Sequence, residues 1–224
     1  MCHASVILFG VIAIHEPDVR SKRVIEIGSF DVNGSMRQYI QSLKPLEYIG
    51  IDIVDGPGVD VICNVDYSVE MFGEESFDLI IVNEVLEHVR DWRQAVSNIK
   101  RICRRGGKVL ITTRSRGFPI HNFPSDYWRY EKEDFSNIFS DLEIEMLESD
   151  REDTPGVFLF AKKPNDFNEN DNENLSLYSI ITGTRKVALN DLDFQNPYYL
   201  QSEKRRRFRE RIQRFASLFM KIMN

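Results

Sequence analysis

The stretch Val24-Ile25-Glu26-Ile27-Gly28 decides the fold class, because it is an apolar run that carries a carboxylate and ends in a glycine. Further along the chain, after an interval long enough for one helix, the stretch Tyr48-Ile49-Gly50-Ile51-Asp52 ends in a second carboxylate. In α/β folds, a glycine turn after the first strand lets the backbone approach a nucleoside-bearing ligand. A carboxylate at the end of the second strand accepts hydrogen bonds from ribose hydroxyls. The two stretches together predict a nucleoside-bearing cofactor on an α/β sheet.

Length and composition suit one α/β domain with an extension. The chain has 224 residues, of which 42% are apolar, which fits a soluble globular protein. Its cysteines (Cys2, Cys63 and Cys103) are odd in number and far apart, which favours a reducing compartment and argues against a zinc site or a disulfide framework. The apolar run 5–14 is about half as long as a membrane span and lacks the basic flank of a secretory signal. We therefore expect a cytoplasmic protein.

The charge is unevenly distributed along the chain. Residues 203–224 carry a local charge of +6, so the rest carries -12 within the overall net charge of -6. The acidic body argues against nucleic acid as the main partner. In the basic tail, apolar residues follow helical spacing: Phe208, Ile212, Phe215, Phe219 and Ile222. Three interpretations stay open: a helix packed on the body, peripheral contact with an anionic membrane, or a contact between the subunits of a homo-oligomer.

Apolar runs bounded by turn signals alternate with stretches of helical period over residues 24–163. This alternation predicts a Rossmann-like, doubly wound, mostly parallel seven-stranded sheet, with its ligand site beyond the carboxyl ends of the strands. The last two strands lie close together in the chain and should form an antiparallel edge hairpin. We expect strands near 24–28, 47–52, 59–63, 77–82, 107–113, 142–148 and 156–162, and helices near 34–43, 91–104 and 131–139. Gly106-Gly107 should end the second helix.

Three segments follow from this pattern. Residues 1–163 should form the cofactor-binding domain. Residues 164–174 (PNDFNENDNEN) are a polar tract with one apolar residue, so they read as a linker or exposed loop. Residues 175–224 should form a C-terminal extension that contains the basic amphipathic helix.

The glycine spacing after the first strand argues against a dinucleotide. A dinucleotide fingerprint requires G-x-G-x-x-G, but Phe30 and Asn33 stand where the second and third glycines should be. A pyrophosphate needs bare backbone amides at a helix N-terminus, and Glu26 would repel a phosphate while attracting an ammonium. A cofactor without phosphates fits this turn better.

Here the chain resembles the class I S-adenosylmethionine-dependent methyltransferases, in particular the type 11-like group. Their first motif is an acidic residue followed by x-G-x-G-x-G, and Glu26-Ile27-Gly28 matches its opening, although the second glycine is missing. The resemblance covers residues 23–163. It is closest to a subset that carries "EIGS-x-DVNGS-x-R" and later "H-N-x-P-S-D-Y-W-R-Y", often associated with glycan or cell-envelope biosynthesis.

The resemblance implies a cofactor site. Glu26 and Gly28 would contact the methionine portion of S-adenosylmethionine, Asp52 the ribose hydroxyls and Asp66 the adenine amino group. The segment 83–88 resembles the family's "LEHV" stretch, which lines the cofactor pocket. The cofactor-binding residues expected on this basis are Glu26, Gly28, Ser29, Asp52, Ile53, Asp66, Asn83 and Glu84.

Methyl transfer is an in-line displacement, so the protein must align the acceptor and, for an oxygen acceptor, remove its proton. His88 and His121 are the candidate bases; for His88 a local capping or packing role is the alternative. His121 lies in a loop just beyond the fifth predicted strand. The loop's aromatic rings could stack on a sugar, and its Asp and Arg could bind hydroxyls or an anionic group. The expected acceptor-binding residues are His121, Asp126, Tyr127, Trp128 and Arg129.

That loop also has a structural interpretation, in which an Asp126–Arg129 ion pair and a buried Trp128 tie it down. The overall expectation is an O-methyltransferase that acts on a saccharide or related small metabolite without a metal. The Asn83-Glu84-Val85-Leu86 sequence lacks the motif of amino-group methylases of adenine or glutamine. An N- or C-methyltransferase of another small molecule remains an alternative, as does a non-catalytic cofactor-binding or scaffold module.

Overall fold

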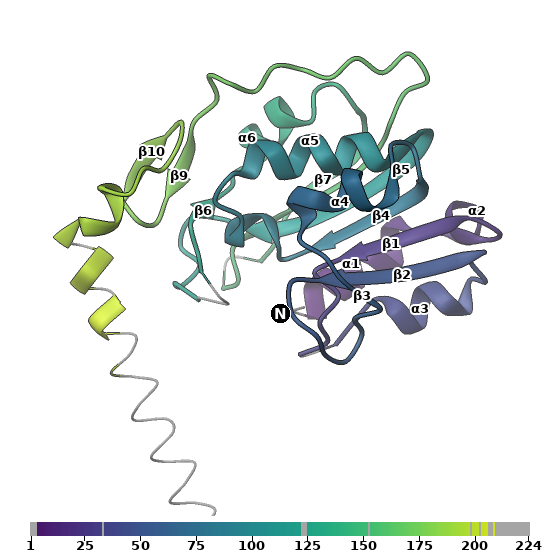
Figure 1. Cartoon of the computed structure of the whole chain (residues 1–224), viewed down its shortest axis with the longest axis horizontal. Coiled ribbons are helices and arrows are strands. Elements are labelled where there is room, and N and C mark those ends of the chain that lie inside the picture. Colours follow the sequence, from purple (N-terminus) through teal and green to yellow (C-terminus); the bar gives the residue numbers. More distant parts are fainter. Residues whose placement is uncertain are drawn as a thin grey trace, which may run out of the picture.

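A seven-stranded sheet forms the centre of the molecule (Figure 1). The computed structural model describes residues 4–32, 34–121, 125–151, 153–197, 199–201, 203–205 and 208. The strand order is β3-β2-β1-β4-β5-β8-β7. The strands are β1 (Arg23–Ile27), β2 (Glu47–Asp52), β3 (Val61–Ile62), β4 (Phe77–Asn83), β5 (Cys103–Arg114), β7 (Glu143–Ser149) and β8 (Gly156–Lys162).

The five strands from β3 to β5 run parallel, and β8 pairs antiparallel with both β5 and β7. The seven predicted strands and the antiparallel edge hairpin are therefore confirmed. The hairpin's second strand, β8, inserts next to β5 and leaves β7 at the edge. Consequently β8 alone runs against the other six strands of this sheet.

Helices cover both faces of the sheet (Figure 1). The described helices are α1 (Ala4–Ala13), α2 (Glu16–Val19), α3 (Arg37–Ser42), α4 (Ser68–Phe72), α5 (Trp92–Ile102) and α6 (Lys132–Ile138), with short 3-10 turns η1 (Val65–Tyr67), η2 (Leu86–His88) and η3 (Asp193–Gln195). Alternate residues of β4 point to opposite faces. Thus Ile80 packs in the cluster that includes α5 and α6, while Leu79 packs in the cluster that includes α1, α2 and α3.

The apolar face predicted for the second helix is buried in α5, where Trp92, Ala95, Val96, Ile99 and Ile102 are all fully buried. The predicted end of this helix is wrong by two residues. It stops at Ile102, and β5 begins at Cys103, so Gly106 and Gly107 lie in the irregular first part of the strand. Gly106 still permits the turn there, because its φ of +76° suits glycine.

Helix α1 was not predicted, because ASVILFGVIA is apolar throughout and has no helical period. It buries Val6 and Phe9 against the sheet and leaves Leu8 and Ile12 more than half exposed. Within the described ranges, no helix is long and apolar enough to cross a membrane.

The C-terminal extension pairs with the predicted acceptor loop. Strands β9 (Leu177–Ser179) and β10 (Thr184–Lys186) form a hairpin, and β9 also pairs with β6 (Trp128–Arg129). The polar tract 164–174 has no helix or strand and crosses the top of the view to reach this hairpin (Figure 1). Most of the predicted basic helix, including all of residues 209–224, lies outside the described residues.

Candidate active site

The predicted cofactor residues meet at one edge of the sheet because β1, β2 and β4 end at the same level. Ile27 is in register with Ile51 of β2 and with Val82 of β4. One residue further, Asn83 is in register with Thr112 of β5. The loops that follow these strands therefore emerge side by side, which is where open α/β sheets bind ligands.

The turn after β1 requires glycine at position 28. Gly28 has a φ of +78°, and a Cβ there would lie 2.2 Å from Cγ2 of Val85. The amides of Gly28 and Ser29 both donate to the carbonyl oxygen of Ile51, at 2.9 and 3.0 Å. The turn is thus held against the end of β2, with its backbone close to the segment that follows β4.

Glu26 is a buried carboxyl group beneath this turn, with 2% of its surface exposed. The Tyr48 hydroxyl donates to its Oε2, and the Ser35 hydroxyl donates to the same atom at 3.3 Å. Burial raises the pKa of Glu26 to about 7, although the Tyr48 hydroxyl and the charge of Arg37 oppose the shift. The group therefore changes charge close to neutral pH.

Asp52 joins the loops after β1 and β2. Its Oδ2 accepts from the amide of Phe30 at 3.2 Å, and its Oδ1 accepts from the amide of Val54 at 3.3 Å. Ile53, the next predicted residue, is 48% exposed. Asp66 lies in η1, where burial and the charge of Asp91 raise its pKa.

Four of the predicted cofactor residues carry a buried polar atom that has no hydrogen-bond partner. The atoms are Oγ of Ser29, Oδ1 of Asp66, Nδ2 of Asn83 and Oε1 of Glu84. Buried polar atoms in proteins are nearly always hydrogen-bonded, so these sites fit a polar ligand. The donors and acceptors of S-adenosylmethionine match such a set, and the residues present therefore fit this group.

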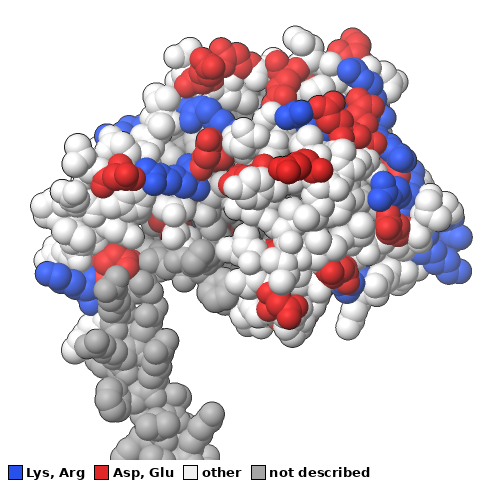
Figure 2. All heavy atoms as spheres, viewed as in Figure 1, with Lys and Arg blue, Asp and Glu red and all other residues white. Residues whose placement is uncertain are grey.

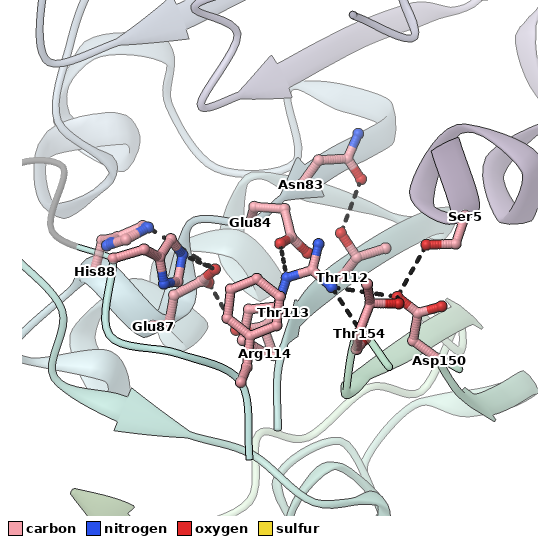
Figure 3. Close-up of polar contacts among 12 residues, drawn as sticks. Ser5, Asn83, Glu84, Glu87, His88, Thr112, Thr113, Arg114, Asp150 and Thr154 are labelled. Atoms are coloured by element: carbon pink, nitrogen blue, oxygen red, sulfur yellow. Dashed lines mark hydrogen bonds and ion pairs between the residues drawn. The ribbon is translucent and has the colours of Figure 1, made fainter. Parts of the chain in front are cut away.

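A second set of polar and ionisable residues lies where β4 and β5 end (Figure 3). Glu84 has a φ of +59°, which is unusual for a residue other than glycine. Its Oε2 contacts Nε of Arg114, whose Nη1 lies 3.2 Å from Oδ2 of Asp150. Burial and the charge of Glu87 raise the pKa of Glu84 to about 8, and Arg114 only partly offsets them.

Glu87 lies fully buried between two histidines. Its Oε2 accepts from the Thr113 hydroxyl at 2.7 Å (Figure 3). Its Oε1 lies 3.8 Å from Nε2 of His88 and 3.6 Å from Nε2 of His121. The two imidazole rings are 4.8 Å apart and nearly perpendicular. The structure thus brings both predicted bases together around one carboxylate.

The charged groups in this cluster shift one another's pKa values. Burial lowers the pKa of His121, but the adjacent Asp126 and Glu87 outweigh burial and raise it to about 9. Burial raises the pKa of Glu87, but His121, His88 and the Thr113 hydroxyl outweigh it and hold that pKa well below its usual range. Among the residues the structure describes, Glu87, His88 and His121 also form a group that could hold a metal ion.

The loop that carries His121 is tied down from within. Oδ2 of Asp126 accepts from the His121 amide at 2.9 Å, and Asp126 also binds both terminal nitrogens of Arg129, at 2.5 and 2.8 Å. Trp128 is fully buried and donates from Nε1 to the carbonyl oxygen of Arg90 at 3.1 Å. Tyr127 is half-buried, and its amide donates to the carbonyl oxygen of Glu87 at 2.8 Å.

These contacts match the structural interpretation of the loop. That Trp128 and Arg129 contact the acceptor stays a prediction, since here both side chains hold the loop's own structure. Sequence reasoning missed Glu87, Thr113 and Arg114 as site residues. A signal was available for Glu87, because it precedes His88 and follows Glu84 by three residues.

The sequence also matches a known family. The model of a family described as a methyltransferase domain matches residues 10–149. The chain is a class I S-adenosylmethionine-dependent methyltransferase. Its cofactor is S-adenosylmethionine, as the resemblance implies. A comparison with curated proteins found no match.

Solved structures share the fold of this methyltransferase. One is the Burkholderia thailandensis 1,6-didemethyltoxoflavin-N1-methyltransferase with bound 1,6-didemethyltoxoflavin and S-adenosylhomocysteine: the TM-score is 0.59 at 17% identity, over 72% of this chain and 79% of that one. Another is an S-adenosylmethionine-dependent methyltransferase from Archaeoglobus fulgidus, with a TM-score of 0.56 at 15% identity over 71% and 93% of the two chains. A third, from Mesorhizobium loti, gives 0.51 at 15% identity over 66% and 93%. At these identities the likeness shows the fold alone.

Proposed function

We propose that this methyltransferase O-methylates a saccharide or related small metabolite. The observation that carries the proposal is the buried Glu87 carboxylate between His88 and His121, at the sheet edge where the cofactor residues gather. An aromatic ring nitrogen can react through a lone pair that is already available, whereas a neutral hydroxyl must lose its proton. A carboxylate–imidazole cluster supplies a place for that proton.

When bound, S-adenosylmethionine supplies an electrophilic methyl group, whose transfer to a hydroxyl oxygen leaves a neutral thioether and sets free the hydroxyl proton. The cofactor would be held by the turn at Gly28 and Ser29, by Glu26 and by Asp52. The chain's own task is then to orient the acceptor and to take up the proton. Neutral His121 can take the proton, because Asp126 and Glu87 stabilise the charged form that results. Since its pKa is raised to about 9, the fraction of enzyme with His121 in this neutral form grows as the pH rises toward 9.

Aromatic side chains next to the cluster support a saccharide acceptor. The ring of Phe118 lies 5.0 Å from that of His121, and Tyr127 is half-buried in the same loop. Aromatic rings pack against the apolar faces of sugars. Charge argues against nucleic acid, because basic and acidic side chains are interspersed on the face shown in Figure 2.

A nitrogen acceptor is the second candidate. The similar Burkholderia enzyme is named as an N1-methyltransferase of a small heterocycle. A methyl-transfer screen separates the candidates: purified protein is incubated with S-adenosylmethionine and either nucleotide sugars and glycan precursors or nitrogen heterocycles. We expect a mass increase of one methylene group in the sugars. Methylation of the heterocycles alone would contradict an oxygen acceptor.

Binding measurements on the same purified protein test for a non-catalytic role. Calorimetry with S-adenosylmethionine and with S-adenosylhomocysteine should show binding of both; a chain that binds them but methylates nothing would support a scaffold role.

The role of residues 203–224 is tested separately. Flotation with anionic liposomes compares the full chain with one that ends at residue 202. Loss of flotation on truncation supports peripheral membrane contact, and no flotation of either chain supports packing on the body or contact between subunits.

A further inference from the structure

We propose that Glu87, His88 and His121 bind a divalent first-row transition-metal ion. The cation site is argued from geometry alone; only its role in catalysis rests on the proposed function. Each residue offers one ligand atom, and the three atoms lie within 4.8 Å of one another. They come from η2 and from the loop after β5, two segments far apart in the chain that the sheet edge brings together.

The spacing leaves room for an ion at the centre of the cluster. Oε1 of Glu87 is 3.6 Å from Nε2 of His121 and 3.8 Å from Nε2 of His88, which is too long for a hydrogen bond. Carboxylate oxygen and imidazole nitrogen bind zinc at about 2.0–2.2 Å, so two ligands at tetrahedral angles lie roughly 3.4 Å apart. The two separations from Glu87 therefore need to contract by only a few tenths of an ångström, and the two histidine nitrogens, which lie within 4.8 Å of each other, need to approach by at most about 1.4 Å.

The carboxylate has no hydrogen-bond partner on the side that faces the histidines. Glu87 is fully buried; Thr113 binds its Oε2, whereas its Oε1 has no hydrogen-bond partner. A buried anionic oxygen without a hydrogen bond is costly. A cation held between Oε1 and the two Nε2 atoms removes that cost.

Both histidines are oriented as metal ligands usually are. Nδ1 of His121 lies 3.1 Å from Oδ2 of Asp126, and Nδ1 of His88 lies against the carbonyl oxygen of Ser125. With a proton on each Nδ1, the lone pair of each Nε2 points toward Glu87. Metal-bound histidines typically donate their other ring nitrogen to a carboxylate or a backbone carbonyl in this way. Arg129 in turn holds Asp126 with two hydrogen bonds.

The donor set indicates the type of ion. Two imidazole nitrogens and one carboxylate oxygen suit manganese, iron, cobalt or zinc, whereas magnesium and calcium prefer oxygen ligands throughout. Three protein ligands leave coordination positions open for an acceptor. With the ion bound, His88 and His121 would hold it, so His121 would act as a ligand and not as the base. The ion would supply Lewis-acid chemistry that lowers the pKa of an acceptor hydroxyl, and solvent water would take the proton in place of His121.

The test uses the full chain after removal of metal by a chelator and dialysis. Co²⁺ is added while visible absorption is recorded, and Zn²⁺ binding is measured by calorimetry. We expect one ion per chain, with d–d bands that indicate nitrogen and oxygen ligands. His88→Ala and His121→Ala should each weaken binding at least about tenfold. His15→Ala is the matched control, because His15 is exposed and lies beside α2, away from the cluster.

Folding of the variants is checked by circular dichroism, and His88→Asn and His121→Asn replace the alanine variants if those do not fold. Wild-type binding of Co²⁺ and Zn²⁺ no tighter than in the His88→Asn/His121→Asn double variant would overturn the proposed site. An ion that binds in a protein that methylates no hydroxyl contradicts the proposed function but not the site. Full O-methylation by chelated, metal-free protein contradicts the ion's role and leaves the proposed function standing.

Discussion

Nε2 of His121 lies 3.6 Å from Oε1 of Glu87, a buried oxygen with no hydrogen-bond partner. The sequence around each residue does not by itself bring the two side chains together. Glu87 follows β4 in the short turn η2, and His121 comes from the loop after β5. The parallel pairing of β4 with β5 brings the two loops together. This relationship makes His121 the residue on which the chemistry is most directly tested.

His121→Ala should lower turnover far more than it lowers affinity for the cofactor. Loss of a general acid–base group typically costs about 10²–10⁴-fold in rate, and His121 belongs to the loop after β5, not to the turn at Gly28 that would hold the cofactor. The measurements are single-turnover methyl transfer and calorimetry with S-adenosylhomocysteine. Equal losses in both, or no loss in either, would show that His121 acts neither on the proton nor as a ligand.

Cofactor affinity should increase with pH around neutrality. The pKa of Glu26 is raised to about 7, and only its ionised form attracts the ammonium group of S-adenosylmethionine. We therefore expect tighter binding at pH 8 than at pH 6, measured by calorimetry. Glu26→Gln should bind weakly and lose most of this pH dependence. An unchanged dependence in the variant would assign it to another group.

The same carboxyl should lower stability as pH rises. The folded pKa of about 7 exceeds the ordinary glutamate value of 4.5, so the folded state holds a proton that the unfolded state has already released. Between pH 4.5 and 7 this group alone reduces the free energy of unfolding by up to about 3 kcal/mol. Glu26→Gln removes the effect. Urea titrations should therefore show that the free energy of unfolding of the variant increases relative to that of wild type as pH rises. A constant difference between pH 5 and 8 would falsify the shifted pKa.

Gly28→Ala should destabilise the protein through two separable effects. The left-handed backbone costs an alanine about 1–2 kcal/mol, and the clash with Val85 adds about 1–3 kcal/mol. Adding Val85→Ala should relieve the clash but leave the backbone cost. Chemical denaturation of wild type, both single variants and the double variant gives the coupling. Strictly additive effects would mean that the approach of Val85 to Gly28 is unimportant.

Arg93→Met should loosen the C-terminal extension without unfolding the sheet. Its guanidinium donates to the carbonyl oxygens of Asn172, Glu173, Leu175 and Val187. Hydrogen exchange in β9 and β10 should therefore accelerate, while exchange in β4 stays slow. The matched control is Arg151→Met, which removes only an exposed ion pair with Asp153. Equal exchange in both variants would contradict the role of Arg93.

Much of the fold was predictable because its signals are local. Runs such as Val24–Ile27 and Phe77–Val82 are buried strands whatever their neighbours, and the apolar face of α5 repeats with helical period. Helix α1 escaped prediction because a helix that is apolar throughout has no period to detect. The hairpin of β9 and β10 escaped because its two strands have three residues each, too few for a pattern.

By itself, the sequence determined the sheet, the glycine turn at Gly28 and the class of cofactor, since each depends on a short stretch and its place in the strand–helix order. Only the tertiary structure decided that Glu87 lies between His88 and His121 and that the extension pairs with Trp128 and Arg129. Those contacts join residues far apart in the chain. They form because strand register brings separate loops to one edge, and no local pattern specifies which side chains meet there.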